Sequence, residues 1–121
     1  IHKEYLEVSS EVIDIIETTK SLSKKVFAVG TTAARALETA YIDETKKGFK
    51  GYTKLFIYPG YKFKAVDKLI TNFHLPKSSL LMLVSAFIGH QNMKEIYKTA
   101  VNEKYRFLSY GDAMLLNRHE I

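Results

Sequence analysis

The segment FHLPKSS, residues 73–79, gathers four polar side chains between a short apolar stretch and a wholly apolar one. They are His74, Lys77, Ser78 and Ser79. Pro76 disfavours a helical backbone at the residue before it, and a serine ahead of an apolar run is a common helix N-cap. We therefore expect a strand to pass into a helix here. Such a helix start favours an anion, a phosphate or a carboxylate, although an ordinary cap with a structural histidine fits the same residues.

A second junction of the same kind is predicted at Gly30, Thr31 and Thr32, with Arg35 one turn later. Glycine lets the chain leave a strand in a tight turn, and the two hydroxyl groups stand at the start of the next helix. A guanidinium can bind a phosphate or a carboxylate through two parallel hydrogen bonds, whereas a surface pair with Glu38 or with another nearby acid explains Arg35 equally well. If the two strands are parallel neighbours, both junctions face one crevice.

Two further segments carry candidate ligand-binding side chains. The sequence of residues 58–61, Tyr-Pro-Gly-Tyr, is typical of a type II turn. Tyr61 and Lys62 place an aromatic ring beside a positive charge, which suits the stacking of a base but also ordinary packing at a strand exit. Asp112 can hold a ribose hydroxyl or orient a donor, although its local sequence favours a simple turn aspartate.

The elements that position these residues alternate between strand and helix. Strands are expected at residues 2–8, 25–30, 52–58, 69–73 and 112–117, and helices after Ser9-Ser10, after Thr31 or Thr32, and over 78–89 and 93–104. This alternation predicts a single α/β domain over residues 1–121 with a substantially parallel sheet, open or closed like a barrel. Residues 43–51, rich in lysine, glutamate and glycine, are expected to form an exposed loop.

The composition limits the class of protein. The chain has 121 residues, 46% of them hydrophobic, which suffices for one domain with a real core. Without cysteine, neither a disulfide framework nor a thiolate metal site can form, so a reducing, cytoplasmic compartment and no metal cofactor are expected. The longest apolar run, residues 80–89, falls well short of the roughly 20 residues that span a bilayer, so no membrane association is expected.

The positive charge is concentrated in one segment. Residues 46–77 contain eight lysines and one aspartate, a net charge of +7 that leaves −2 for the remainder of the chain. Seven of the 15 aromatic residues lie in the same segment. Lysines interleaved with aromatic rings suit a polyanion with exposed bases, although a basic surface loop over an aromatic strand gives the same pattern.

Residues 71–87, TNFHLPKSSLLMLVSAF, resemble the S-adenosylmethionine:tRNA ribosyltransferase-isomerase family of queuosine biosynthesis. Segments 29–40, 51–73 and 105–116 agree with the same family and in the same order, so the resemblance covers almost the whole chain. The departures, at Ala33-Ala34, Ser79 and Leu108, remove no charged group.

The resemblance implies that this chain is the C-terminal portion of a larger, two-domain enzyme, with the missing N-terminal part as its partner. It implies transfer of the ribosyl group of S-adenosylmethionine to a 7-aminomethyl-7-deazaguanine base in the anticodon loop of tRNA. The ribosyl group then isomerises to give epoxyqueuosine, and adenine and methionine are released. The chain alone is expected to be inactive and prone to self-association, because truncation exposes apolar surface and sheet edges.

Residue chemistry assigns candidate roles within that reaction. The candidate catalytic acid or base is His74, because histidine titrates near neutral pH. Candidates for substrate or anion contacts are Lys77, Ser78, Thr31, Thr32, Arg35, Tyr61, Lys62 and Asp112. The alternative is a basic tRNA-binding module without a catalytic group, in which His74 is structural.

Overall fold

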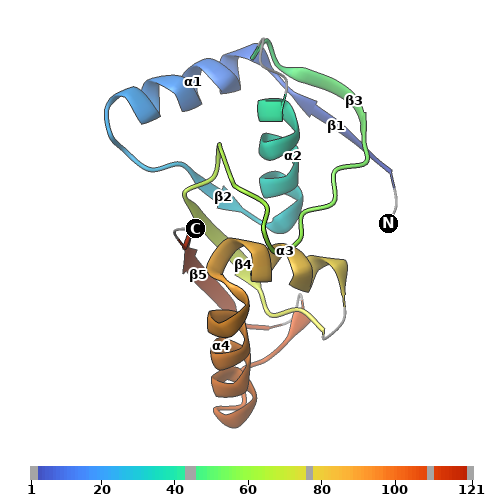
Figure 1. Cartoon of the computed structure of the whole chain (residues 1–121), viewed down its shortest axis with the longest axis vertical. Coiled ribbons are helices and arrows are strands. Elements are labelled where there is room, and N and C mark those ends of the chain that lie inside the picture. The colour runs from blue at the N-terminus through green and yellow to red at the C-terminus, as the bar shows by residue number, and fades with distance from the viewer. Residues whose placement is uncertain (1–2, 43–45, 76–77, 109–110, 120–121) are drawn as a thin grey trace.

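The structure is a computed structural model that describes residues 3–42, 46–75, 78–108 and 111–119. In chain order, its elements are β1 (Glu4–Val8), α1 (Ser10–Ser21), β2 (Phe27–Val29), α2 (Thr31–Ile42), β3 (Phe49–Thr53), β4 (Lys68–Asn72), α3 (Ser79–Ile88), α4 (His90–Asn102) and β5 (Ala113–Asn117). Figure 1 shows β1, β3 and α1 at one end of the longest axis and α4 at the other, with β2 and β4 between them.

The strands form two small sheets of mixed direction. β1 pairs antiparallel with β3, while the second sheet has the order β2-β4-β5. Within it, β2 and β4 are parallel, whereas β4 and β5 are antiparallel. The α/β class is confirmed, but the expected substantially parallel sheet is wrong, and the described strands do not close into a barrel. The apolar pattern marks each strand and says nothing of its direction, which follows from connections such as the helix pair α3–α4 between β4 and β5.

The strand expected at residues 52–58 is displaced towards the N-terminus. β3 begins at Phe49, where it pairs with Val8 of β1, and ends at Thr53. The loop expected over 43–51 is therefore shorter at its C-terminal end, and its residues 43–45 lie outside the described part. After β3 the chain turns as the sequence predicts, since the Tyr61 N–H donates to the Tyr58 carbonyl at 3.0 Å and Gly60 has a φ of +104°.

α3 supplies much of the core. Its residues 83–88 are all buried and pack with Leu69 of β4 and with Phe63, whose ring meets that of Phe87 edge to face at 4.9 Å. The first turn is different, because Leu80 is 43% exposed and Met82 is 38% exposed. The helix is thus buried on all sides only in its second half, although its sequence is apolar throughout.

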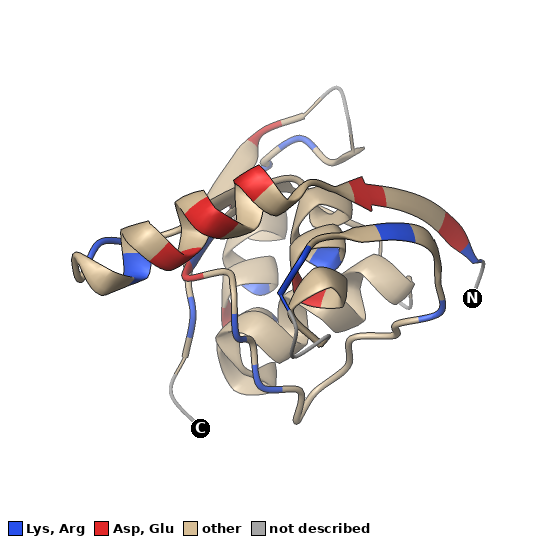
Figure 2. Cartoon of the chain, turned by 90° about the horizontal axis from the view of Figure 1, so that it is seen from above, with Lys and Arg blue, Asp and Glu red and all other residues tan. Residues whose placement is uncertain are grey.

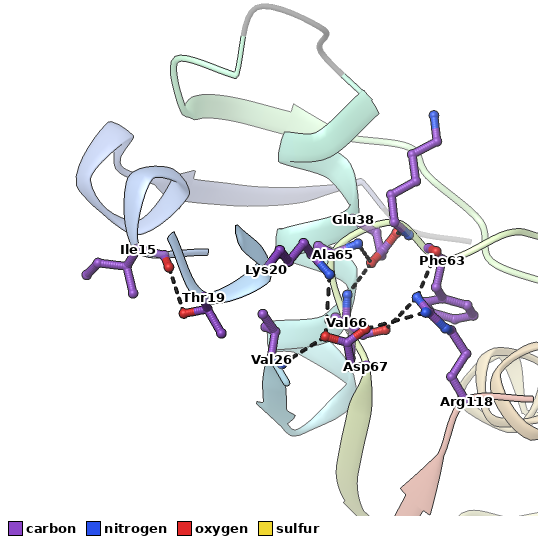
Figure 3. A network of polar contacts seen from close by, with 11 residues as sticks. Ile15, Thr19, Lys20, Val26, Glu38, Phe63, Ala65, Val66, Asp67 and Arg118 are labelled. Carbon is purple, nitrogen blue, oxygen red and sulfur yellow. Dashed lines mark hydrogen bonds and ion pairs between the residues drawn. The ribbon is translucent and has the colours of Figure 1, made fainter. Parts of the chain in front are cut away.

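The buried carboxylate of Glu38 holds α2 against the segment that leads into β4. Its oxygens accept the backbone N–H groups of residues 64–66 at 2.8–2.9 Å and the hydroxyl of Tyr61 at 3.0 Å. Figure 3 shows this carboxylate beside Ala65 and Val66. Four donors replace the water that the carboxylate loses on burial, so the charge is tolerated inside the protein.

Asp67, at the end of the same segment, connects four parts of the chain (Figure 3). Its carboxylate accepts the Val26 N–H at 2.9 Å and forms ion pairs of 3.4 Å with Lys20 and with Arg118. The end of α1, the start of β2 and the residue after β5 are thereby fixed to the start of β4. These contacts set the position of β2, and with it the start of α2.

Candidate functional site

A pocket of about 340 Å³ opens where the N-terminal ends of α2 and α3 approach each other. Its lining residues come from β1, α2, α3 and the segment after β3, and they are Glu4, Thr31, Thr32, Arg35, Leu55, Phe56, Ile57, Ser79, Leu80 and Leu83. The volume lies within the range of ligand pockets, at its lower end. The pocket therefore has the size and the mixed polarity of a small-molecule site.

The start of α2 presents unpaired donors to this pocket. Gly30 leaves β2 with a φ of +97°, which favours glycine, and its N–H donates to Ile70 of β4 at 2.7 Å. The first intrahelical bond runs from the Ala34 N–H to the Gly30 carbonyl, so the N–H groups of residues 31–33 have no acceptor within the helix. Thr31 is only 8% exposed, and across the described residues its hydroxyl forms no hydrogen bond. The positive end of the helix dipole thus borders the pocket.

Arg35 is held in place on one wall of the pocket. Its Nε donates to the Leu55 carbonyl at 2.8 Å, and its Nη1 forms an ion pair of 3.1 Å with Glu4. The pair with Glu38 does not form, because Glu38 is buried and bonded elsewhere. The alternative pair with another nearby acid does form, and that acid is Glu4. The guanidinium is therefore held at a fixed position between β1 and α2, with its charge offset by the Glu4 carboxylate.

The second junction borders the same pocket, as the sequence predicts for strands that are parallel neighbours. The Ser78 side chain caps α3 by accepting the Leu81 N–H at 3.1 Å, and Ser79 and Leu80 line the pocket. Lys77 lies outside the described residues. The pocket thus brings together the starts of α2 and α3, and with them Thr31, Thr32 and Arg35.

His74 lies apart from the pocket lining, at the end of β4. It is 8% exposed, its Nε2 is 3.0 Å from the Thr71 hydroxyl, and its backbone N–H donates to the Tyr97 hydroxyl at 2.9 Å. Burial lowers the pKa of His74 and so favours the neutral imidazole. Its role as an acid or base stays a prediction.

The remaining candidates are placed away from the pocket lining. The hydroxyl of Tyr61 donates to Glu38, and burial together with that carboxylate raises its pKa, while Lys62 is exposed. Asp112 accepts the Arg106 backbone N–H at 2.8 Å, a hydrogen bond that lowers the pKa of the carboxyl group. Asp112 thus makes the local contact that its turn sequence favours, and its role as a substrate contact stays a prediction.

The lysine-rich segment lies partly against acidic residues. Lys46 forms an ion pair of 2.9 Å with Glu17 of α1, and Lys50 one of 3.6 Å with Glu7 of β1. Figure 2 shows Asp and Glu positions, in red, along α1 and β1. The net charge of +7 counted along the sequence is thus reduced by neighbours at this end of the molecule.

Several lining residues could not be found from the sequence. Glu4 has the ordinary position of a polar residue on a two-faced strand, and Leu55 and Ile57 were placed in a strand that the structure ends at Thr53. Their place in the pocket depends on the packing of β1 and of the segment after β3 against α2. No local sequence signal reports that packing.

The described residues form neither a cluster suited to a metal ion nor a helix that could cross a membrane. Over residues 3–42, 46–75, 78–108 and 111–119, no three His, Cys, Asp or Glu side chains form a group that could hold a metal ion. Within the same ranges, every helix is too short or too polar to cross a bilayer.

Comparison with known proteins identifies relatives over nearly the whole chain. A family model described as queuosine biosynthesis protein matches residues 1–116. The chain is 57% identical over 117 residues to the S-adenosylmethionine:tRNA ribosyltransferase-isomerase of Halothermothrix orenii, covering 96% of this chain and 34% of that protein. It also matches the crystal structure of the S-adenosylmethionine tRNA ribosyltransferase of Thermotoga maritima, with a TM-score of 0.88 and 47% identity, over 92% of this chain and 39% of that one. The resemblance seen in the sequence is confirmed, and the chain belongs to the queuosine biosynthesis protein family.

Proposed function

We propose that this chain forms part of an S-adenosylmethionine:tRNA ribosyltransferase-isomerase and contributes one wall of its substrate site. The observation that carries the proposal is the pocket between two helix starts, where Thr31, Thr32 and Arg35 meet. The 57% identity to the Halothermothrix orenii enzyme supports the reaction class. The chain spans 34% of that relative, so the activity is proposed for the longer protein, with this chain alone inactive.

The proposed reaction transfers the ribosyl group of S-adenosylmethionine to a 7-aminomethyl-7-deazaguanine base in the anticodon loop of tRNA. Isomerisation of that group gives epoxyqueuosine, and adenine and methionine leave. We place the reaction in the cytoplasm, where tRNA is modified, and assign no metal to it. The part of the enzyme that this chain does not cover completes the site.

Within this reaction, the residues divide by their surroundings. Thr31, Thr32 and Arg35 bind an anionic group of a substrate, and Lys77 and Ser78 add charge and donors at the α3 start. His74 acts as an acid or base, which its neutral, buried imidazole supports because a neutral ring can accept a proton. Tyr61, Lys62 and Asp112 are proposed as contacts to the larger substrate, outside the pocket.

A second candidate function is a basic tRNA-binding module without a catalytic group. The observation in its favour is that Lys54, Lys62 and Lys64 are exposed on the segment between β3 and β4. Such lysines bind phosphates irrespective of sequence, and binding then weakens steeply with salt.

The proposal is tested in the full-length protein by measuring adenine release from S-adenosylmethionine with an unmodified tRNA substrate. Arg35→Lys should reduce kcat/KM by about 10- to 100-fold, the loss expected when a charged hydrogen-bond pair is broken. Lys98→Arg, at an exposed lysine of α4 outside the pocket, is the control and should retain activity. Full activity of Arg35→Lys would remove the pocket from the substrate site.

A His74→Asn variant separates the two candidate functions. If His74 is catalytic, kcat falls while affinity for tRNA is retained. If the chain only binds tRNA, turnover by the longer enzyme is unaffected by His74→Asn, and Lys62→Met with Lys64→Met lowers the affinity for tRNA and the salt dependence of binding.

A further inference from the structure

The residues that line the pocket indicate which ligand it binds as well as a site for an anion. We propose that it holds the amino-acid end of S-adenosylmethionine, with the carboxylate at the start of α2 and the ammonium near Glu4. The inference rests on the proposed function and names which part of which substrate the pocket takes. The competing occupant is a tRNA phosphate, which also suits a helix start.

The start of α2 provides the carboxylate site. The N–H groups of residues 31–33 have no intrahelical acceptor, and Thr31 lines the pocket while being only 8% exposed. The Thr31 residue is largely buried at the pocket, and within the described part of the chain its hydroxyl forms no hydrogen bond, so this hydroxyl can bind a ligand oxygen. A ligand oxygen in the pocket would satisfy this hydroxyl together with the backbone donors.

Glu4 distinguishes a zwitterion from a polyanion. Its carboxylate lines the same pocket, 3.1 Å from Nη1 of Arg35, with 37% of the side chain exposed. Its charge offsets that of Arg35, so the pair adds no net attraction for a phosphodiester, while the second carboxylate oxygen can accept a hydrogen bond from an ammonium group. An α-amino acid presents a carboxylate and an ammonium a few ångströms apart, so it is complementary to the Thr31 and Glu4 ends together.

The rest of the lining suits the side chain of methionine. Leu55, Ile57 and Leu83 add apolar residues to the lining, and Phe56 adds an aromatic residue that is 37% exposed. Methylene groups gain by leaving water at such a wall, and an aromatic ring favours a ligand cation such as a sulfonium. A phosphate group would gain no free energy from these apolar contacts.

The test compares two ligands in the full-length protein without tRNA. Calorimetry should show that the wild type binds S-adenosylmethionine at least 10-fold more tightly than decarboxylated S-adenosylmethionine, which lacks the carboxylate. Thr31→Val removes the hydroxyl and nearly keeps the volume, and it should reduce this preference by about 5-fold or more. Thr31→Ser should restore it, and Thr18→Val, at an exposed threonine of α1, should leave it unchanged.

A preference that is the same in Thr31→Val and in the wild type would overturn the inference. A Thr31→Val variant that binds both ligands normally but binds an anticodon stem-loop more weakly would assign the pocket to a tRNA phosphate. If Thr31→Val fails to fold, Glu4→Gln replaces it, and it should weaken inhibition by L-methionine by about 5-fold or more. Unchanged inhibition by L-methionine would equally overturn the inference.

Failure of the proposed function can be distinguished from failure of this inference, because different measurements test them. Adenine release by the wild type tests the reaction, whereas the ligand preference tests the pocket. Absent turnover with an intact preference would reject the reaction and leave the amino-acid site. Normal turnover with no effect of Thr31→Val on the ligand preference would support the reaction and reject the amino-acid site.

Discussion

Glu38 is fully buried and satisfied by donors from the protein itself. Three backbone N–H groups and one phenol surround its two oxygens, each at hydrogen-bond distance. The sequence places this glutamate in a helix beside an arginine three residues earlier, where an exposed ion pair is the ordinary expectation. Only the position of residues 61–66 in space reveals its real partners.

We predict that Glu38→Gln lowers the free energy of unfolding by about 3 kcal/mol. An amide has one acceptor oxygen, so two of the four donors would face an NH₂ group, and each buried donor left unpaired costs about 1–3 kcal/mol. Urea unfolding followed by circular dichroism measures the change. Glu11→Gln, at an exposed position in the first turn of α1, should change stability by less than about 1 kcal/mol. Equal effects of the two variants would contradict the prediction.

We predict that His74 makes the protein less stable as the pH falls below about 6.5. Burial lowers the pKa of the folded imidazole, so at acidic pH the unfolded chain binds a proton that the folded chain does not. The contribution is fully present above the unfolded pKa and is lost as the pH falls towards the folded one, with a slope of at most about 1.4 kcal/mol per pH unit.

Urea unfolding between pH 5 and 7.5 tests this dependence on His74. His74→Asn should flatten the decline, whereas His90→Asn, at an exposed histidine, should keep it. A decline of the same slope in all three proteins would assign it to other groups.

At the scale of elements, both strand-to-helix junctions were predictable and the direction of the strands was not. The FHLPKSS and VGTT segments mark helix starts through proline, serine, glycine and threonine, whose local preferences act wherever the segment lies. β5 lies antiparallel to β4, with Leu116 opposite Leu69, because of how α3 and α4 return the chain. Apolar alternation is the same for both directions, so it could not decide between them.

We predict that Ser78→Ala destabilises the protein by about 1 kcal/mol through loss of the α3 cap. The Ser78 side chain accepts the Leu81 N–H at 3.1 Å, a bond that alanine cannot replace. Ser79→Ala is a close control, since Ser79 is the first residue of the helix and is exposed. Thermal unfolding should give a lower Tm for Ser78→Ala than for Ser79→Ala. The reverse order would show that the cap does not stabilise the helix.

At the scale of the whole molecule, one face of the three-stranded sheet is left uncovered by the described chain. Val29, Ile70 and Leu115 lie opposite one another across β2, β4 and β5, and Val29 and Leu115 are 70% and 60% exposed. Large apolar side chains in a row on an open face favour association with another surface. We therefore expect self-association of this chain to occur through this open face of the sheet.

We predict that the 121-residue chain forms dimers or larger species in a concentration-dependent manner, and that Leu115→Glu shifts it towards monomer. Burial of a charge at the centre of an apolar contact is costly, so the contact is lost. Multi-angle light scattering over a range of concentrations gives the mass. Val101→Glu, at a valine of α4 that is 64% exposed, should leave the association unchanged. A wild-type chain that stays monomeric at high concentration would contradict the prediction.

The hydrogen bond and the ion pairs of Asp67 also bear on how the chain folds. Its partners Val26 and Lys20 are 41 and 47 residues away in the sequence, so each contact closes a long loop. Closing such loops costs chain entropy before any contact repays it, and contacts of this kind tend to form late. We infer that Asp67 contributes little to the rate at which the protein folds and acts mainly to slow its unfolding.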